Sequence, residues 1–160
     1  MRRALMICLF AAALTASCAS SAPRQTTRAT GGWTWAYDAA SGVASAQQAD
    51  AAGNVTVRVT CQAPDGDLTI RDSSIMAGGR LRGQQNVQFR VGNEAISVRG
   101  AVEGGALVVR MPRRPPNLQA YAHVSREPVS LIVGGRTVTY AEGAIEKIAL
   151  VANSCWPTGS

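Results

Sequence analysis

Alternation of apolar and polar residues is the feature that most restricts how this chain can fold. In residues 54–61 every second side chain is apolar, and the apolar ones are Val55, Val57, Val59 and Cys61. A period of two places one face of an extended strand against a core and the other in water. The same pattern recurs in short segments separated by glycine or proline, at 33–38, 43–48, 67–73, 86–91, 95–102, 106–111, 129–133 and 136–140.

Short, closely spaced strands joined by glycine-containing turns are typical of antiparallel sheets. We therefore expect a mainly β fold, either an antiparallel β-sandwich or an open barrel. Two segments lack the alternation and predict helices: a short one near 117–125, after the proline-rich break at 112–116, and a C-terminal one near 142–153. The C-terminal helix has an apolar stripe formed by Ala141, Ile145, Ile148 and Ala152.

The first residues have the composition of an export signal. Arg2 and Arg3 precede an apolar run at 4–14, and small residues follow it. This run is shorter than the ~20 apolar residues that a membrane-spanning helix needs. We expect residues 1–17 to be a signal peptide, and no other segment of the sequence approaches the length of a transmembrane helix.

Residues 14–18, Leu-Thr-Ala-Ser-Cys, resemble the lipobox of bacterial lipoproteins, and Thr15 departs from it by standing where that family usually has leucine. The resemblance implies that Cys18 receives a diacylglycerol and becomes the mature N-terminus, so that fatty acyl chains such as palmitate hold the protein on a membrane. Ala19, in place of aspartate, implies the periplasmic face of the outer membrane, with the inner membrane as the alternative. Ordinary signal-peptidase cleavage, after Ala22, is the other alternative to lipidation.

The mature chain divides into a tether and one domain. Residues 18–32 begin with the lipidated cysteine and continue with small, polar and basic side chains that have no apolar periodicity. Such a segment cannot bury enough surface to offset the entropy of ordering it. As a flexible coil it would hold the domain ~20 Å from its anchor. Residues 33–160 are of a length that supports a single β-rich domain.

The four cysteines have three different expected fates. Cys8 leaves with the signal peptide and Cys18 carries the lipid, which leaves Cys61 and Cys155. An even pair in an oxidising compartment predicts a disulfide bond. Metal binding is the alternative, but the sequence has no CxxC motif and a single histidine, His123, so we assign no metal site and no cofactor.

No arrangement in the sequence predicts a catalytic site. His123 has no acidic neighbour, and the GxSxG, SxxK and HExxH motifs are absent. The Asp-Gly-Asp sequence at 65–67 lacks the further oxygen ligands of a calcium loop, so we interpret it as a turn. We therefore assign no catalytic residue and expect a non-enzymatic protein. A hydrolase that uses His123 is the least favoured alternative.

The basic residues are the strongest indication of a ligand. The chain has 16 basic and 10 acidic side chains, a net charge of +6, which loses two charges when Arg2 and Arg3 leave with the signal peptide. Guanidinium groups on loops can bind phosphate or carboxylate, although solvated loops on a basic protein are the alternative. The candidate anion-binding residues lie in two segments, and they are Arg110, Arg113, Arg114, Arg80 and Arg82.

These observations predict a lipid-anchored cell-envelope protein of binding or structural type. Its partners would be anionic envelope components or another envelope protein, because export excludes nucleic acid. An inhibitor or accessory partner of an envelope hydrolase is the alternative. In residues 117–155 the hairpin, the Gly143-Ala144 step, the helix and Cys155 loosely resemble small proteobacterial periplasmic β-sandwich proteins of the invasion-associated type, a likeness of architecture that transfers no function.

Aromatic residues are few, and three of them alternate at Trp33, Trp35 and Tyr37. We expect this face of the first strand to be part of the core, with an exposed sugar- or peptide-binding platform as the alternative. Trp156, beside Cys155, is expected to cover the disulfide.

Overall fold

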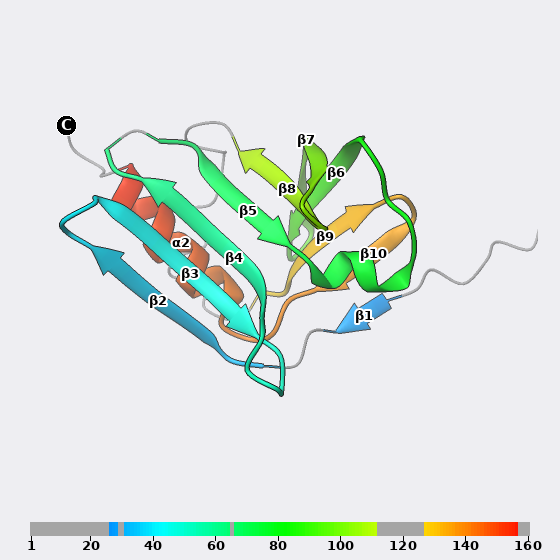
Figure 1. Ribbon diagram of the computed structural model, residues 1–160, viewed down its shortest axis with the longest axis horizontal. Coiled ribbons are helices and arrows are strands. Elements are labelled where there is room, and N and C mark those ends of the chain that lie inside the picture. Colours follow the sequence, from blue (N-terminus) through cyan, green and yellow to red (C-terminus); the bar gives the residue numbers. More distant parts are fainter. Residues whose placement is uncertain (1–25, 29–30, 65, 112–126, 157–160) are drawn as a thin grey trace, which may run out of the picture.

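The computed structural model describes residues 26–28, 31–64, 66–111 and 127–156. Within these residues the chain forms one curled ten-stranded sheet, and a C-terminal helix covers the inner face of one part of it (Figure 1). The mainly β class is confirmed, and the strands adopt the open, barrel-like form of that prediction. The helix predicted near 117–125 lies outside the described residues. No helix in the described part of the chain is long and apolar enough to span a membrane.

The strands lie close to the segments that alternation predicts. Their bounds are β1 (Thr26–Arg28), β2 (Trp33–Asp38), β3 (Val43–Ala49), β4 (Val55–Gln62), β5 (Leu68–Asp72), β6 (Gln84–Val91), β7 (Glu94–Glu103), β8 (Ala106–Met111), β9 (Val129–Val133) and β10 (Arg136–Thr139). A short 3₁₀ helix, η1 (Ser74–Gly78), follows β5. The sequence did not predict η1.

The order of strands across the sheet is β1-β10-β9-β6-β7-β8-β5-β4-β3-β2. All neighbouring pairs are antiparallel except β1 and β10, which are parallel. Strand β1 lies inside the segment 18–32, for which we predict a tether. Alternation could not identify it, because Thr26–Arg28 contains only polar residues.

The C-terminal helix α2 (Ala144–Cys155) packs against β2, β3, β4 and β5 on the inner face of the curl. It lies behind these strands in Figure 1. Its buried side chains include the predicted stripe residues Ile145, Ile148 and Ala152. The helix begins two residues later than predicted because Gly143 precedes it in a left-handed conformation, with φ of 85°, and thereby ends the preceding turn.

The inner face of the sheet carries the apolar half of each alternating strand. Val57 and Val59 on β4, and Leu68 and Ile70 on β5, are all fully buried under α2. The strands beyond β5 continue this core with Val109, Phe89 and Leu131. The polar half of each strand points to the opposite face, which we call the outer face. At β4 and β5 the outer face is the one turned toward the viewer in Figure 1.

Tyr140, directly after β10, connects the two ends of the curled sheet. Its hydroxyl donates a hydrogen bond to Oδ2 of Asp72 on β5 at 3.1 Å, and its ring packs edge-on against Trp33 of β2 with centroids 5.7 Å apart. The backbone N–H of Ala141 donates to Oε1 of the buried Gln48 on β3 at 3.2 Å. Strands far apart in sheet order are thus held around one residue.

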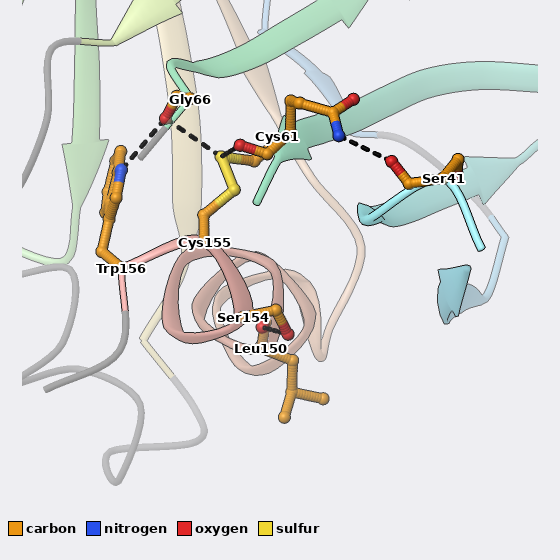
Figure 2. Close-up of a disulfide and its surroundings, with 8 residues drawn as sticks. Ser41, Cys61, Gly66, Leu150, Ser154, Cys155 and Trp156 are labelled. Carbon is orange, nitrogen blue, oxygen red and sulfur yellow. Dashed lines mark hydrogen bonds between the residues drawn. A yellow bond between two sulfur atoms is a disulfide. The ribbon is translucent and has the colours of Figure 1, made fainter. Parts of the chain in front are cut away.

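The predicted disulfide between Cys61 and Cys155 is present (Figure 2). It joins the end of β4 to the last residue of α2, and the two Cα atoms are 6.0 Å apart. Trp156 is buried beside it, and its indole N–H donates to the carbonyl of Gly66 at 3.0 Å. That carbonyl also lies 3.1 Å from Sγ of Cys61. The helix end is therefore fixed both to the strand and to the turn after it.

Replacing both bridging cysteines, as Cys61→Ala with Cys155→Ala, should lower the free energy of unfolding. The sequence separation is 94 residues, and a bridge that closes a loop of about this length stabilises by roughly 4 to 5 kcal/mol in the chain-entropy model. Urea unfolding of the variant and the oxidised parent measures the difference. The parent under a reductant is the control, and it should match the variant. A loss below about 1 kcal/mol would contradict a stabilising role.

Candidate functional site

The structure places part of the predicted anion-binding set. Arg80 and Arg82 are exposed in the loop between η1 and β6, and Arg110 is exposed near the end of β8. Arg113 and Arg114 lie outside the described residues, as do Cys18 and His123.

The loop of Arg80 and Arg82 borders the end of β7, whereas Arg110 lies on β8. The loop of Arg80 and Arg82 runs to Gly83, whose carbonyl accepts from the N–H of Val102, and Val102 pairs with Leu107 near the beginning of β8. Arg110 lies near the other end of β8 and forms an ion pair with Glu103, at 3.3 Å. Such exposed pairs contribute about 0 to 1 kcal/mol. The structure therefore does not join the two groups into one site.

Instead, the outer face of the sheet brings together arginines from four neighbouring strands. Arg58 on β4 is the cross-strand partner of Arg71 on β5. Arg110 on β8 lies diagonally from Arg71, two residues beyond its partner Val108. The register of β7 with β8 places Arg99 next to Arg110. We call these exposed residues, Arg58, Arg71, Arg99 and Arg110, the arginine face.

A shallow hollow of about 230 Å³ lies on this face where β4 and β5 pair. The side chains of Arg58 and Arg71 line it, together with Val55 at one end and the hydroxyl-bearing residues Thr56 and Ser73. Among the described residues, no carboxylate lines it. The chemistry available in the hollow is thus cationic hydrogen-bond donation with neutral polar groups around it.

Sequence reasoning missed Arg58 and Arg71 as a pair. Each stands at an outward position of a correctly predicted strand, so the alternation already indicated that both are exposed. Only the register between β4 and β5 sets them opposite one another, and a shift of one residue would put an arginine beside a buried valine. A search for outward arginines at matching distances from the turn near Pro64 would have found the pair.

The aromatic alternation on β2 differs from the prediction. Trp33 is half-buried against Tyr140, but Trp35 is 41% exposed and Tyr37 is 46% exposed. The expected core face is therefore wrong for Trp35 and Tyr37. The reason is that β2 is the last strand of the sheet. No further strand lies beside it, so Trp35 and Tyr37 lack neighbours on that side and stay exposed. Alternation identifies a face but not whether the strand is central or at an edge.

Asp72 is the most deeply buried charged group among the described residues. Its Oδ1 accepts hydrogen bonds from the N–H and the hydroxyl of Ser74, at 2.8 and 2.6 Å, and from the N–H of Ile75 at 3.2 Å. These bonds hold η1, and the bond from Tyr140 occupies Oδ2. Burial raises the pKa of Asp72 above its ordinary value, and burial together with the charge of Asp72 raises the pKa of Tyr140 well above 10.0.

This carboxyl has a structural role. It is buried, and both of its oxygens accept hydrogen bonds from groups of its own fold. Within the part of the chain that the structure describes, no three His, Cys, Asp or Glu side chains come together as metal ligands. The arginine face is thus the candidate site.

Comparison with protein-family models, with curated proteins and with solved structures finds no match to this chain. The function is therefore argued from the residues themselves.

The pKa of Asp72 predicts a specific dependence of stability on pH. Because folding raises this pKa, the folded protein holds the proton more tightly than the unfolded chain does. The contribution of this proton to the free energy of unfolding is fully present below the ordinary carboxyl pKa, and it is lost as the pH rises through the raised pKa of folded Asp72. The Asp72→Asn protein has no such titration. The free energy of unfolding of the parent, minus that of the variant, should fall from acidic to neutral pH in urea titrations.

The pH-dependent contributions of the other carboxyl groups cancel when the variant's free energy of unfolding is subtracted from the parent's. The hydroxyl of Ser41 lowers the pKa of Asp38, and the backbone N–H of Asn54 lowers that of Asp50, but both groups are present in parent and variant. A difference that stays constant, or that rises with pH, would contradict the prediction.

Proposed function

We propose that this protein is a lipid-anchored, non-enzymatic binding protein of the bacterial cell envelope, and that its arginine face engages an anionic envelope component. The observation that carries the proposal is the convergence of Arg58, Arg71, Arg99 and Arg110 on one face of the sheet. Within the described residues, Arg110 is the one member of this set that forms an ion pair, and its partner is Glu103. Such a surface attracts polyanions and is screened by salt.

The position of β1 supports a location close to the membrane. Thr26–Arg28 pairs with β10, so only the residues between Cys18 and Thr26 separate the proposed lipid from the sheet. Fully extended at ~3.4 Å per residue, these eight steps reach about 27 Å. A domain held within this distance meets anionic headgroups without needing high affinity, because the anchor supplies a high local concentration.

Lipidation at Cys18 is tested by labelling cells with an alkynyl palmitate and purifying the protein. The parent should carry the label, and Cys18→Ser should carry none, because the thiol is the acyl acceptor in the lipobox interpretation. Cys8→Ser, in the signal peptide, is the matched control and should keep the label. Equal labelling of parent and Cys18→Ser would contradict the anchor.

The arginine face is tested with the mature chain carrying Cys18→Ser and with vesicles of phosphatidylglycerol and phosphatidylcholine. Each arginine near an anionic surface contributes about 1 kcal/mol. Replacing Arg99 and Arg110 with glutamine should therefore weaken co-sedimentation by about 30-fold at low salt. Binding should also fall as salt rises and be absent with phosphatidylcholine alone.

The matched control replaces Arg80 and Arg82 with glutamine, which removes the same charge from the loop before β6. This control should bind within about threefold of the parent, since its arginines lie off the arginine face. Equal losses in the two variants would show that net charge, and not the arginine face, drives binding. No binding by the parent to anionic vesicles would contradict the proposal for this component.

A further inference from the structure

We infer that the hollow between Arg58 and Arg71 is a binding site for a phosphate group. The inference rests on the proposed function, because it names the chemical group that the arginine face recognises and the residues that hold it. The proposed function requires only a general attraction to anions, whereas this inference requires that one pair of arginines binds a discrete oxyanion.

The register of the sheet supplies the first argument. Arg58 and Arg71 occupy directly opposed positions on β4 and β5. Like charges at opposed positions of neighbouring strands repel each other and destabilise the pairing. An anion between them removes this repulsion. Neither guanidinium has a carboxylate partner among the ion pairs of the described residues, so the compensating charge has to come from a ligand or from solvent ions.

The hydrogen bonds of the two side chains supply the second argument. Arg58 donates to Oε1 of Gln47 on β3 at 3.4 Å, and Arg71 donates to the carbonyl of Gly104 in the β7–β8 turn at 2.9 Å. These acceptors lie on opposite sides of the β4–β5 pair, so the two side chains diverge and leave the hollow between them. Both acceptors are neutral, and each occupies one nitrogen of a guanidinium that has five N–H donors.

The shape of the site favours phosphate over carboxylate. The two guanidinium groups lie on different sides of the hollow, and rotation of both exposed side chains toward it would let one phosphate accept from both, because its oxygens are arranged tetrahedrally. A carboxylate has only two oxygens, both in one plane, and a single bidentate arginine already uses one lone pair on each of them. A volume of about 230 Å³ is several times the ~30 Å³ that a water molecule takes up in the liquid. The hollow therefore has room for this group together with part of what it is attached to.

The hydroxyls at the hollow's edge complete a polar lining. Ser73 donates to the carbonyl of Thr56 at 3.0 Å, and Thr56 donates to the carbonyl of Gln48 at 3.3 Å. Each hydroxyl has a single hydrogen, so either one would donate to a bound oxyanion by rotating away from its carbonyl acceptor.

The test is an NMR titration of the mature Cys18→Ser protein with inorganic phosphate, at ionic strength held constant with chloride. Saturable shifts are expected at the backbone amides of Thr56, Arg58, Arg71 and Ser73. Arg58→Gln and Arg71→Gln should each weaken phosphate binding by about tenfold or more, because each removes charge-assisted hydrogen bonds. Both side chains are exposed and their mutual repulsion is lost, so the substitutions should keep the fold and should not lower its thermal midpoint.

Arg90→Gln is the matched control, since Arg90 is an exposed arginine on β6 that does not line the hollow. It should bind phosphate as the parent does. Three results would overturn the site: chloride alone producing the same shifts, phosphate shifts spread over the surface with no saturation, or unchanged affinity in both Arg58→Gln and Arg71→Gln.

The source of the phosphate is resolved by repeating the vesicle sedimentation with Arg58→Gln. One arginine of the face accounts for about a fivefold loss of vesicle binding through charge alone. A loss clearly larger than this identifies a lipid headgroup as the ligand, whereas a loss no larger than this, together with loss of inorganic phosphate binding, identifies a soluble phosphorylated ligand. The two proposals fail separately. Vesicle binding without a saturable phosphate site contradicts this inference alone, and a phosphate site without vesicle binding contradicts the proposed membrane component alone.

Discussion

The hydrogen bond from Tyr140 to Asp72 closes this fold. A single curled sheet has no second sheet to pack on, so its two ends must be held around the core by side chains. Tyr140 does this from the end of β10, bonding Asp72 on β5 and packing on Trp33 of β2. The same carboxyl organises η1 through Ser74 and Ile75. Removing one partner would leave a buried polar group unsatisfied, which costs about 1 to 3 kcal/mol.

This closure divides the molecule into two chemically different faces. Helix α2 occupies the inner face, and the bond from Cys155 to Cys61 holds its end in place. Because α2 and the apolar core lie on the inner side of the curl, the outer face of β4, β5, β7 and β8 carries the polar side chains, including the arginine face. The same alternation that builds the core therefore produces the basic surface on which the proposed function depends.

Local patterns predicted most of the elements. Alternation located β2 to β10, and the stripe at Ile145, Ile148 and Ala152 located α2, because burial on one face imposes a period that is visible in the residues themselves. The pairing of Cys61 with Cys155 followed from counting cysteines. Patterns failed where the environment is set by neighbours distant in sequence: β1 has no apolar residues, and Trp35 and Tyr37 are exposed because β2 lies at an edge.

The sequence by itself determined strands β2 to β10, the face that most of their residues occupy, the C-terminal helix and the disulfide, since each depends on spacing or composition along the chain. Only the tertiary structure decided the order of strands, the closure at Tyr140 and the opposition of Arg58 and Arg71. The physical reason is that register and strand order arise from contacts between distant segments. Alternation along a strand indicates the face to which a side chain points, but it does not indicate which residue of the neighbouring strand lies opposite.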